Sequence, residues 1–388
     1  MKQQITPIND IKLVKKPFYF GIRNIFKDNI HKQSKYDSLD ISSTLINAIG
    51  RNMYIESYVR NYNNNRNMPS ADTLFRRVKD THVVCNDNEY DKNSGSDIIS
   101  KMVDLTVTNA KSLGLVDKKI NVAIDEHDEP YYGHSNNKLI YTPYHKYRGT
   151  DKAYRLATME SVDKPRMTLS VIRKIPLDGI DLSKEVRLLV GHAISLGIMI
   201  NILLMEKGYL SAKVLKALGN MDINYIIPVK LNKKAKRLMD TNMNEYNNIR
   251  YSIIKTEISS YRDKAETYLV HVIYNKNGKK YDFAFYTNMD ANMDNIIELA
   301  ELYRKRWCIE NGYLEKKESK EKTHSYTMYV RYFLYLFSIL LYNLWILINC
   351  IISIMGKTHL IFIDFLISLG RSIEREGNNR YKMINHNV

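Results

Sequence analysis

The spacing of hydrophobic residues changes near Lys119. Before that point apolar residues recur every three or four positions, as at Ile41, Leu45 and Ile49, which predicts amphipathic helices. Further helices are predicted at 54–59 and 98–113 by the same spacing. Residues 1–118 are therefore expected to form a mostly helical region.

A shorter helix is predicted from Pro69 to Lys79, because Pro69 and Ser70 form a helix-start signal. This helix carries Arg76 and Arg77. Both could contact DNA in the manner of a recognition helix. An ordinary surface helix is the alternative, and the sequence leaves both interpretations open.

After Lys119 short apolar and β-branched runs alternate with helical patterns, which favours an α/β sheet. Four strands are predicted, at 120–124, 138–142, 201–205 and 225–229, with a fifth at either 154–159 or 167–174. Helices are predicted at 182–196 and, after a Ser211 cap, up to 218. The order is three strands, helix, strand, helix, strand. It is similar to the order of a ribonuclease-H-like domain with a mixed sheet.

Residues 232–290 interrupt this order with a β-rich insertion. Strands are predicted at 250–258, 268–274 and 281–286. The last two are separated by a turn that contains Asn277 and Gly278. Asn-Gly is a strong signal for a tight β-hairpin.

The stretch after the insertion combines helical periodicity with an unusual set of polar residues. Apolar residues from Ile296 to Trp307 predict a helix that continues to Lys317. At 100° per residue one face of it would carry Tyr303, Arg306, Glu310 and Lys317. A solvated face with an ordinary Arg306–Glu310 ion pair would explain this pattern. The spacing Y-x2-R-x3-E-x6-K also resembles the signature of DDE transposases of the insertion-sequence-four type.

Two further stretches match motifs of these transposases. Ala123-Ile-Asp125-Glu-His-Asp-Glu-Pro-Tyr-Tyr-Gly133 resembles the motif of the first catalytic aspartate. Leu203-Leu-Met-Glu206-Lys-Gly-Tyr209 resembles the motif of the second acid, although that family has aspartate where this chain has Glu206. A local metal site formed by Glu126, His127, Asp128 and Glu129 is a rival interpretation.

The resemblance implies a chemistry for these residues. Asp125, Glu206 and Glu310 would be the three catalytic carboxylates and would bind two Mg²⁺ or Mn²⁺ ions. Two divalent ions can clamp the attacking and leaving oxygens of a phosphodiester displacement. Arg306 and Lys317 would contact DNA phosphates. Tyr303 would either bind a phosphate or pack beneath the helix.

Composition agrees with a nucleic-acid partner, although a basic protein without such a partner would show the same excess of charge. The 388 residues include 58 Lys and Arg against 42 Asp and Glu, a formal net charge of +16, and such an excess suits a polyanion. Cys85, Cys308 and Cys350 fit no zinc pattern, and a reduced, cytoplasmic setting is expected. The apolar run 332–355 is long enough for a membrane span. Burial in protein is expected instead, because the run contains several polar residues.

We therefore interpret the sequence as a DDE transposase with a ribonuclease-H-like α/β fold that cleaves and joins DNA at the ends of an insertion sequence. Its partners would be transposon-end and target DNA, with a homodimer on DNA, no membrane, and a cytoplasmic, nucleoid-associated location. We predict a helical region at 1–118, a catalytic domain at 119–231 and 291–355, an insertion at 232–290, and a helical tail at 356–388. The alternative, suggested by Glu206, is an inactive descendant that only binds DNA.

Overall fold

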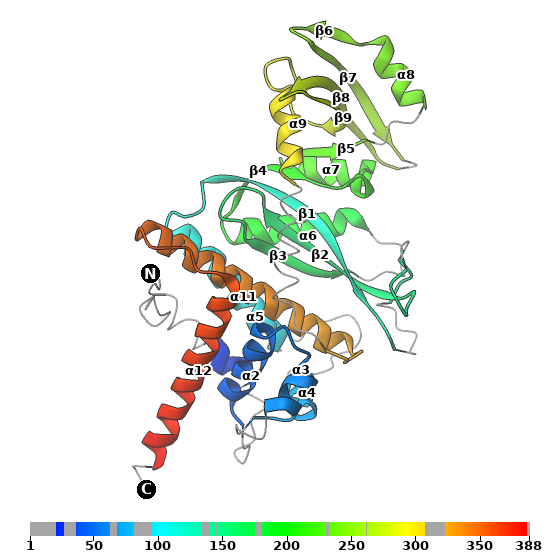
Figure 1. Ribbon diagram of the computed structural model, residues 1–388. Helices are drawn as coiled ribbons and strands as arrows, with labels where there is room; N and C mark the ends of the chain where they lie inside the picture. Colours follow the sequence, from blue (N-terminus) through cyan, green and yellow to red (C-terminus); the bar gives the residue numbers. More distant parts are fainter. Residues whose placement is uncertain are drawn as a thin grey trace. The chain divides into compact units, whose positions relative to one another are not determined.

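The computed structural model describes residues 21–26, 36–62, 68–80, 95–133, 140–143, 146–174, 181–229, 233–260, 262–306 and 323–385 (Figure 1). The chain divides into two compact units. The first comprises Met1–Leu115 and Tyr313–Val388, and the second comprises Val116–Gly312. The functional domain boundaries predicted from the sequence stay predictions.

In its described residues the first unit is mainly helical. Besides the helical residues 21–25, its helices are α2 (Ser38–Gly50), α3 (Ile55–Tyr62), α4 (Ala71–Asp80), α5 (Gly95–Ser112), α11 (Met328–Ile354) and α12 (Phe362–Asn385). The helices predicted at 41–49, 54–59, 69–79 and 98–113 therefore correspond to α2 to α5. Asp37 caps α2 in a reciprocal capping box with Asp40.

Helix α11 packs against α5, α4 and α12 within the first unit. By length and composition alone it could cross a membrane, but most of it is buried within the protein. Its polar side chains have partners there: Asn343 donates to Thr106 of α5 at 3.2 Å. Asn349 both donates to and accepts from the backbone of Leu360. An amide that is satisfied inside a packed unit is the arrangement expected of a core helix.

A nine-stranded sheet forms the centre of the described part of the second unit. Its strands are β1 (Lys119–Pro130), β2 (Ala153–Ser161), β3 (Thr168–Lys174), β4 (Met199–Leu204), β5 (Asn224–Pro228), β6 (Asn244–Tyr246), β7 (Ile249–Ser259), β8 (Lys264–Lys276) and β9 (Lys279–Thr287). They lie in the order β3-β2-β1-β4-β5-β9-β8-β7-β6. β4 is parallel to β1 and β5, whereas β2 is antiparallel to β1 and β3.

The sheet agrees with the predicted order of elements and differs in detail. Both 154–159 and 167–174 lie in strands, β2 and β3. The predicted strand at 138–142 is wrong where it is described, because Tyr141 forms only an isolated bridge to Ala153. The strand expected to end at Ile124 instead continues to Pro130, because Asp125–Pro130 pair with β2.

Helices cover the sheet on both faces. The predicted helices at 182–196 and 211–218 correspond to α6 (Leu182–Ser195) and α7 (Ala212–Asn220). Asp181 caps α6 and Ser211 caps α7 through their side chains. In the insertion, Met239 of α8 (Lys233–Thr241) packs against one face of β7–β9. α9 (Ile296–Arg304) contacts the other face, where Tyr303 stacks on Phe283.

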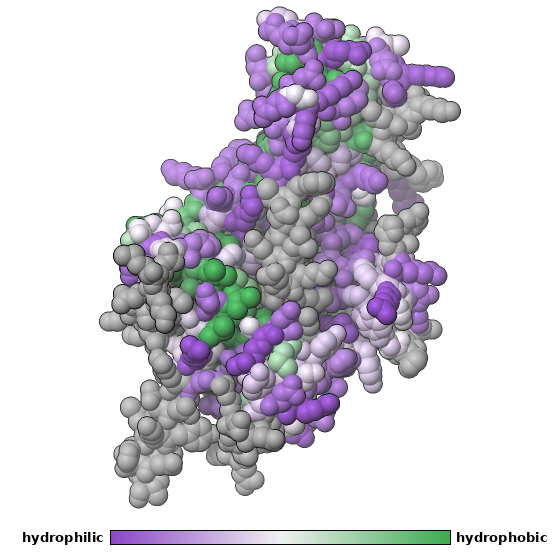
Figure 2. Space-filling model, in the orientation of Figure 1, coloured by the Kyte–Doolittle hydropathy of each residue, from purple (hydrophilic) through white to green (hydrophobic). Residues whose placement is uncertain are grey.

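The insertion extends the same sheet rather than forming a separate one. β9 pairs with β5, and β8 and β9 form the predicted hairpin with Asn277 and Gly278 at its turn. Both turn residues have positive φ, 51° and 72°, as a tight hairpin requires. The visible surface of this part is largely hydrophilic (Figure 2).

Candidate functional site

Two acids predicted from the sequence meet at neighbouring strands. Asp125 lies in β1, and Glu206 follows the end of β4 by two residues. The last aligned pair between these strands is Ala123 with Leu204. Each acid lies two residues beyond that pair, so both are level and project from the same face of the sheet.

A β-bulge is responsible for this alignment. Ile120 pairs with Ile200, but Val122 pairs with Leu203, so β4 contains one residue more than β1 in this interval. A bulge of this kind shifts which face the following side chains occupy. Asn201 lies in the irregular segment and donates to Asn121 at 3.0 Å. The bulge therefore has a specific side-chain support.

Arg306 completes the group. Its Nη1 lies 3.5 Å from Asp125 Oδ2 and 3.3 Å from Glu206 Oε1. The Arg306 and Asp125 side chains are 8% and 11% exposed, and Glu206 is 49% exposed. One buried guanidinium thus links the two acids, one buried and one facing solvent.

The backbone at Arg306 differs from the prediction. The helix that was expected to continue to Lys317 ends at Arg304, with Lys305 as its C-cap. Arg306 lies in the turn that follows, where its N–H donates to the Tyr303 carbonyl. Tyr303 and Arg306 therefore do not occupy successive turns of one helix. The turn brings the guanidinium to the acids.

Burial and charge shape the electrostatics of Asp125. Loss of solvent raises the pKa of Asp125 to about 7, and repulsion by Glu206 acts in the same direction. Arg306 and the Glu126 N–H, which donates to Asp125 Oδ1 at 2.8 Å, oppose that rise. An acid in this position favours a neighbouring positive charge when it is ionised.

Tyr303 packs against the insertion strands. Its ring stacks on Phe283 at 5.1 Å, and the Arg306 guanidinium lies 5.7 Å from its centroid. Burial raises the pKa of the Tyr303 phenol. This geometry favours the packing role over a phosphate contact.

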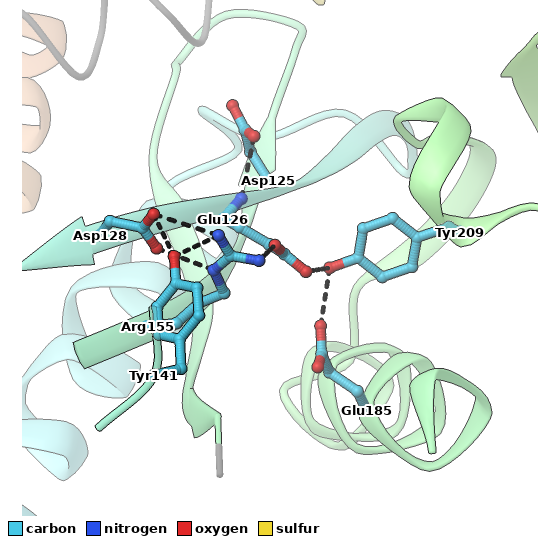
Figure 3. A network of polar contacts seen from close by, with 7 residues as sticks. All are labelled: Asp125, Glu126, Asp128, Tyr141, Arg155, Glu185 and Tyr209. Carbon is cyan, nitrogen blue, oxygen red and sulfur yellow. Dashed lines mark hydrogen bonds and ion pairs between the residues drawn. The ribbon is translucent and has the colours of Figure 1, made fainter. Parts of the chain in front are cut away.

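A second polar cluster occupies the opposite face of β1 (Figure 3). Arg155 of β2 forms ion pairs with Glu126 at 2.8 Å and Asp128 at 2.7 Å. The Tyr141 hydroxyl also donates to Asp128. The Tyr209 hydroxyl donates to Glu185 of α6 at 2.6 Å and lies 3.3 Å from Glu126.

This pairing argues against the rival metal site. Glu126 and Asp128 project from one face of β1 and are held by Arg155. His127 and Glu129 project from the other face and bond to each other at 2.7 Å. Within the described residues no group of three or more His, Cys, Asp or Glu side chains is close enough to hold a metal ion.

The remaining predicted residues belong to the first unit or lie outside the described residues. Arg76 and Arg77 belong to the first unit. Arg76 is exposed, whereas Arg77 is 8% exposed, and this burial does not favour a direct DNA contact by Arg77. Glu310 and Lys317 lie outside the described residues.

Several residues that surround the two acids were not predicted from the sequence. Arg155 and Glu185 carry no local motif, and Tyr209 was noted only as part of the Glu206 motif. Glu160 of β2 is 5% exposed and adds to the negative field at Asp125. Glu160 lies two residues after Thr158, on the same face of a buried strand. That position was the available signal, because a charged residue seldom occupies a buried position without a role.

Comparison with known proteins gives these residues a context. Residues 192–344 match the family described as "Transposase DDE domain". The matched segment includes Glu206, Tyr303 and Arg306, and Asp125 precedes it. No curated protein matches the chain.

Two solved transposase structures match the chain, one of them with a likeness in overall fold. The piggyBac transposase in a synaptic complex with hairpin DNA is 10% identical, with a TM-score of 0.52 over 96% of this chain and 80% of that chain. The Drosophila P element transposase in a strand transfer complex is 14% identical, with a TM-score of 0.27 over 56% and 43% of the two chains. The likeness to the former confirms the mixed α/β, ribonuclease-H-like fold class.

Proposed function

We propose that this protein is a DDE transposase of the insertion-sequence-four type, which cleaves and joins DNA strands at the ends of an insertion sequence. One observation carries the proposal. Asp125 and Glu206 meet on one face of neighbouring strands, with Arg306 between them. The family match across residues 192–344 supports the same assignment.

The two acids suit a divalent cation. They offer carboxylate oxygens, the ligands that Mg²⁺ prefers, and they already share one positive group. Asp125, Glu206 and Glu310 would hold two Mg²⁺ or Mn²⁺ ions. When bound, the ions would activate the attacking hydroxyl and stabilise the leaving oxygen of a phosphodiester.

The chain's own residues would orient the DNA. Arg306, which is buried against the acids, would neutralise them beside the bound DNA, and Lys317 would contact a phosphate near the cleaved end. Arg76 would contact DNA outside the site. We expect a homodimer on DNA that acts on transposon ends and target DNA in the cytoplasm.

An inactive, DNA-binding descendant is the second candidate. The observation that favours it is Glu206, which stands where the resembling family has aspartate. The extra methylene of glutamate moves the carboxylate by about a bond length, and a displacement of about 1 Å can cost about a hundredfold in rate.

Cleavage of DNA that carries the ends of the element tests the proposal. The full chain is incubated with duplexes from the two gene-flanking ends, and strand nicks are measured with Mg²⁺ or Mn²⁺. We expect Asp125→Asn to reduce nicking by at least about a hundredfold and to leave duplex binding within about twofold. Equal nicking by this variant would remove Asp125 from the site.

Glu206→Asp separates the two candidates in the same assay. If the parent cuts and this variant cuts less, the backbone is adapted to glutamate and the enzyme is active. If the parent does not cut and the variant does, the chain is an inactive descendant. If neither cuts while both bind the duplex, the enzymatic proposal is wrong.

A further inference from the structure

The segment that carries Glu206 is anchored from the face opposite to its carboxylate. Glu206 precedes a short 3₁₀ turn, η4 (Lys207–Tyr209), and its carbonyl accepts the Tyr209 N–H at 3.0 Å. The Glu206 side chain takes no part in capping the turn. Tyr209 is 2% exposed, so its ring fixes the turn inside the protein.

The hydroxyl of Tyr209 reaches two other elements. It donates to Glu185 in the first turn of α6 at 2.6 Å, and Glu126 Oε1 lies 3.3 Å away. Glu126 directly follows Asp125 in β1, and its N–H donates to the Asp125 carboxylate. One phenol therefore connects the turn of Glu206 to the strand of Asp125 (Figure 3).

Arg155 holds the other side of this connection. It forms ion pairs with Glu126 and Asp128, two residues apart on the same face of β1. Without a cation there, these two carboxylates would repel each other and Glu185. Because a guanidinium can bond several oxygens in a fixed geometry, Arg155 sets the direction of the Glu126 side chain toward Tyr209.

We propose that Tyr209 and Arg155 are positioning residues, which act through Glu126 to set the separation of the Asp125 and Glu206 carboxylates. The inference rests on the proposed function, because it assigns a purpose to that separation. Outer residues that orient metal ligands commonly change metal affinity by about 10–100-fold when they are removed. Neither residue touches the reacting groups.

Binding of Mn²⁺ to the DNA-free full chain, followed by electron paramagnetic resonance, tests the inference. Tyr209→Phe keeps the ring and removes only the hydroxyl. We expect Mn²⁺ affinity to fall about tenfold or more. Tyr225→Phe is the matched control, because Tyr225 is also buried and its hydroxyl donates to Thr267 at 3.0 Å on β8. We expect its Mn²⁺ affinity to stay within about twofold of the parent's.

Arg155→Lys provides a second variant if Tyr209→Phe does not fold, as judged by circular dichroism and thermal unfolding. Lysine keeps the positive charge but cannot hold Glu126 and Asp128 in the fixed geometry of a guanidinium. This variant should therefore also weaken Mn²⁺ binding. Weakening by either variant with an unchanged Tyr225→Phe supports the inference. Equal weakening by Tyr209→Phe and Tyr225→Phe would indicate a general loss of stability and overturn it.

Asp125→Asn distinguishes this inference from the proposed function. If the parent binds Mn²⁺ and Asp125→Asn does not, the cation site stands. Parent-like affinity in Tyr209→Phe and Arg155→Lys would then overturn the positioning role alone. A parent that binds no Mn²⁺ would remove the cation site and the positioning role together.

Discussion

At the scale of single residues, the feature with the largest consequence is one arginine between two acids. Arg306 is buried, and its Nη1 lies within 3.5 Å of both carboxylates. Removal of one member of a buried charged group leaves the others without compensation. The acids would then repel each other across the two neighbouring strands.

We predict that Arg306→Gln lowers the free energy of unfolding by about 1–3 kcal/mol, as measured by urea denaturation. The matched control is Arg304→Gln, two residues earlier, where an exposed side chain pairs with Glu301 at 3.0 Å. An exposed pair of this kind contributes under about 1 kcal/mol. Equal effects of the two changes would argue against a buried charge group.

Residue identities in the site were partly predictable. Asp125 and Glu206 were found because each follows a short apolar run in a recognisable motif. Arg155 was not, because its partners Glu126 and Asp128 lie 27 or more positions away and meet it only when β2 pairs with β1. Such contacts leave no trace in local periodicity.

At the scale of elements, the sequence predicted the order of strands better than their ends. Residues 125–129 are all polar, so the strand was predicted to end at Ile124. In the structure they pair with β2, and Arg155 neutralises two of the acids. The helix end at Arg304 was missed for a related reason, because apolar spacing alone favours continuation to 317.

We predict opposite effects for two glycine substitutions. Gly278 has φ 72° in the β8–β9 turn, where an added Cβ meets no atom within 4 Å. Gly278→Ala should therefore lower stability by about 1 kcal/mol through backbone strain alone. Gly191 lies in helix α6 and also has free space around a Cβ, so Gly191→Ala should raise stability by about 0.5–1 kcal/mol. Thermal unfolding of both variants checks the signs.

At the scale of the whole molecule, charge decides the expected behaviour toward DNA. The net charge of +16 would draw the chain to any polyanion, with or without cleavage. Phosphate contacts release counterions, so affinity for DNA falls as salt rises. Charge alone therefore does not separate an active enzyme from a binding protein.

We predict that affinity for a duplex falls at least about tenfold between 50 and 200 mM salt, as measured by fluorescence anisotropy. The control is the same titration with Asp125→Asn, which removes one negative charge from the site and should keep a similar slope. An affinity that does not change with salt would contradict DNA as the partner.

The bulge in β4 also shows why an alternative register between β1 and β4 is unfavourable. If β4 continued in the register of Ile120 with Ile200, the same sequence would place Met205 beside Asp125. Glu206 would then turn to the other face, toward Glu126 and Glu185. Four carboxylates, Glu126, Asp128, Glu185 and Glu206, would then share the face on which Arg155 pairs with Glu126 and Asp128. Repulsion between like charges thus opposes a shift of β4 by one residue. The acids around Arg155 on one face of the sheet thereby keep β4 in the register that brings Asp125 and Glu206 together on the other face.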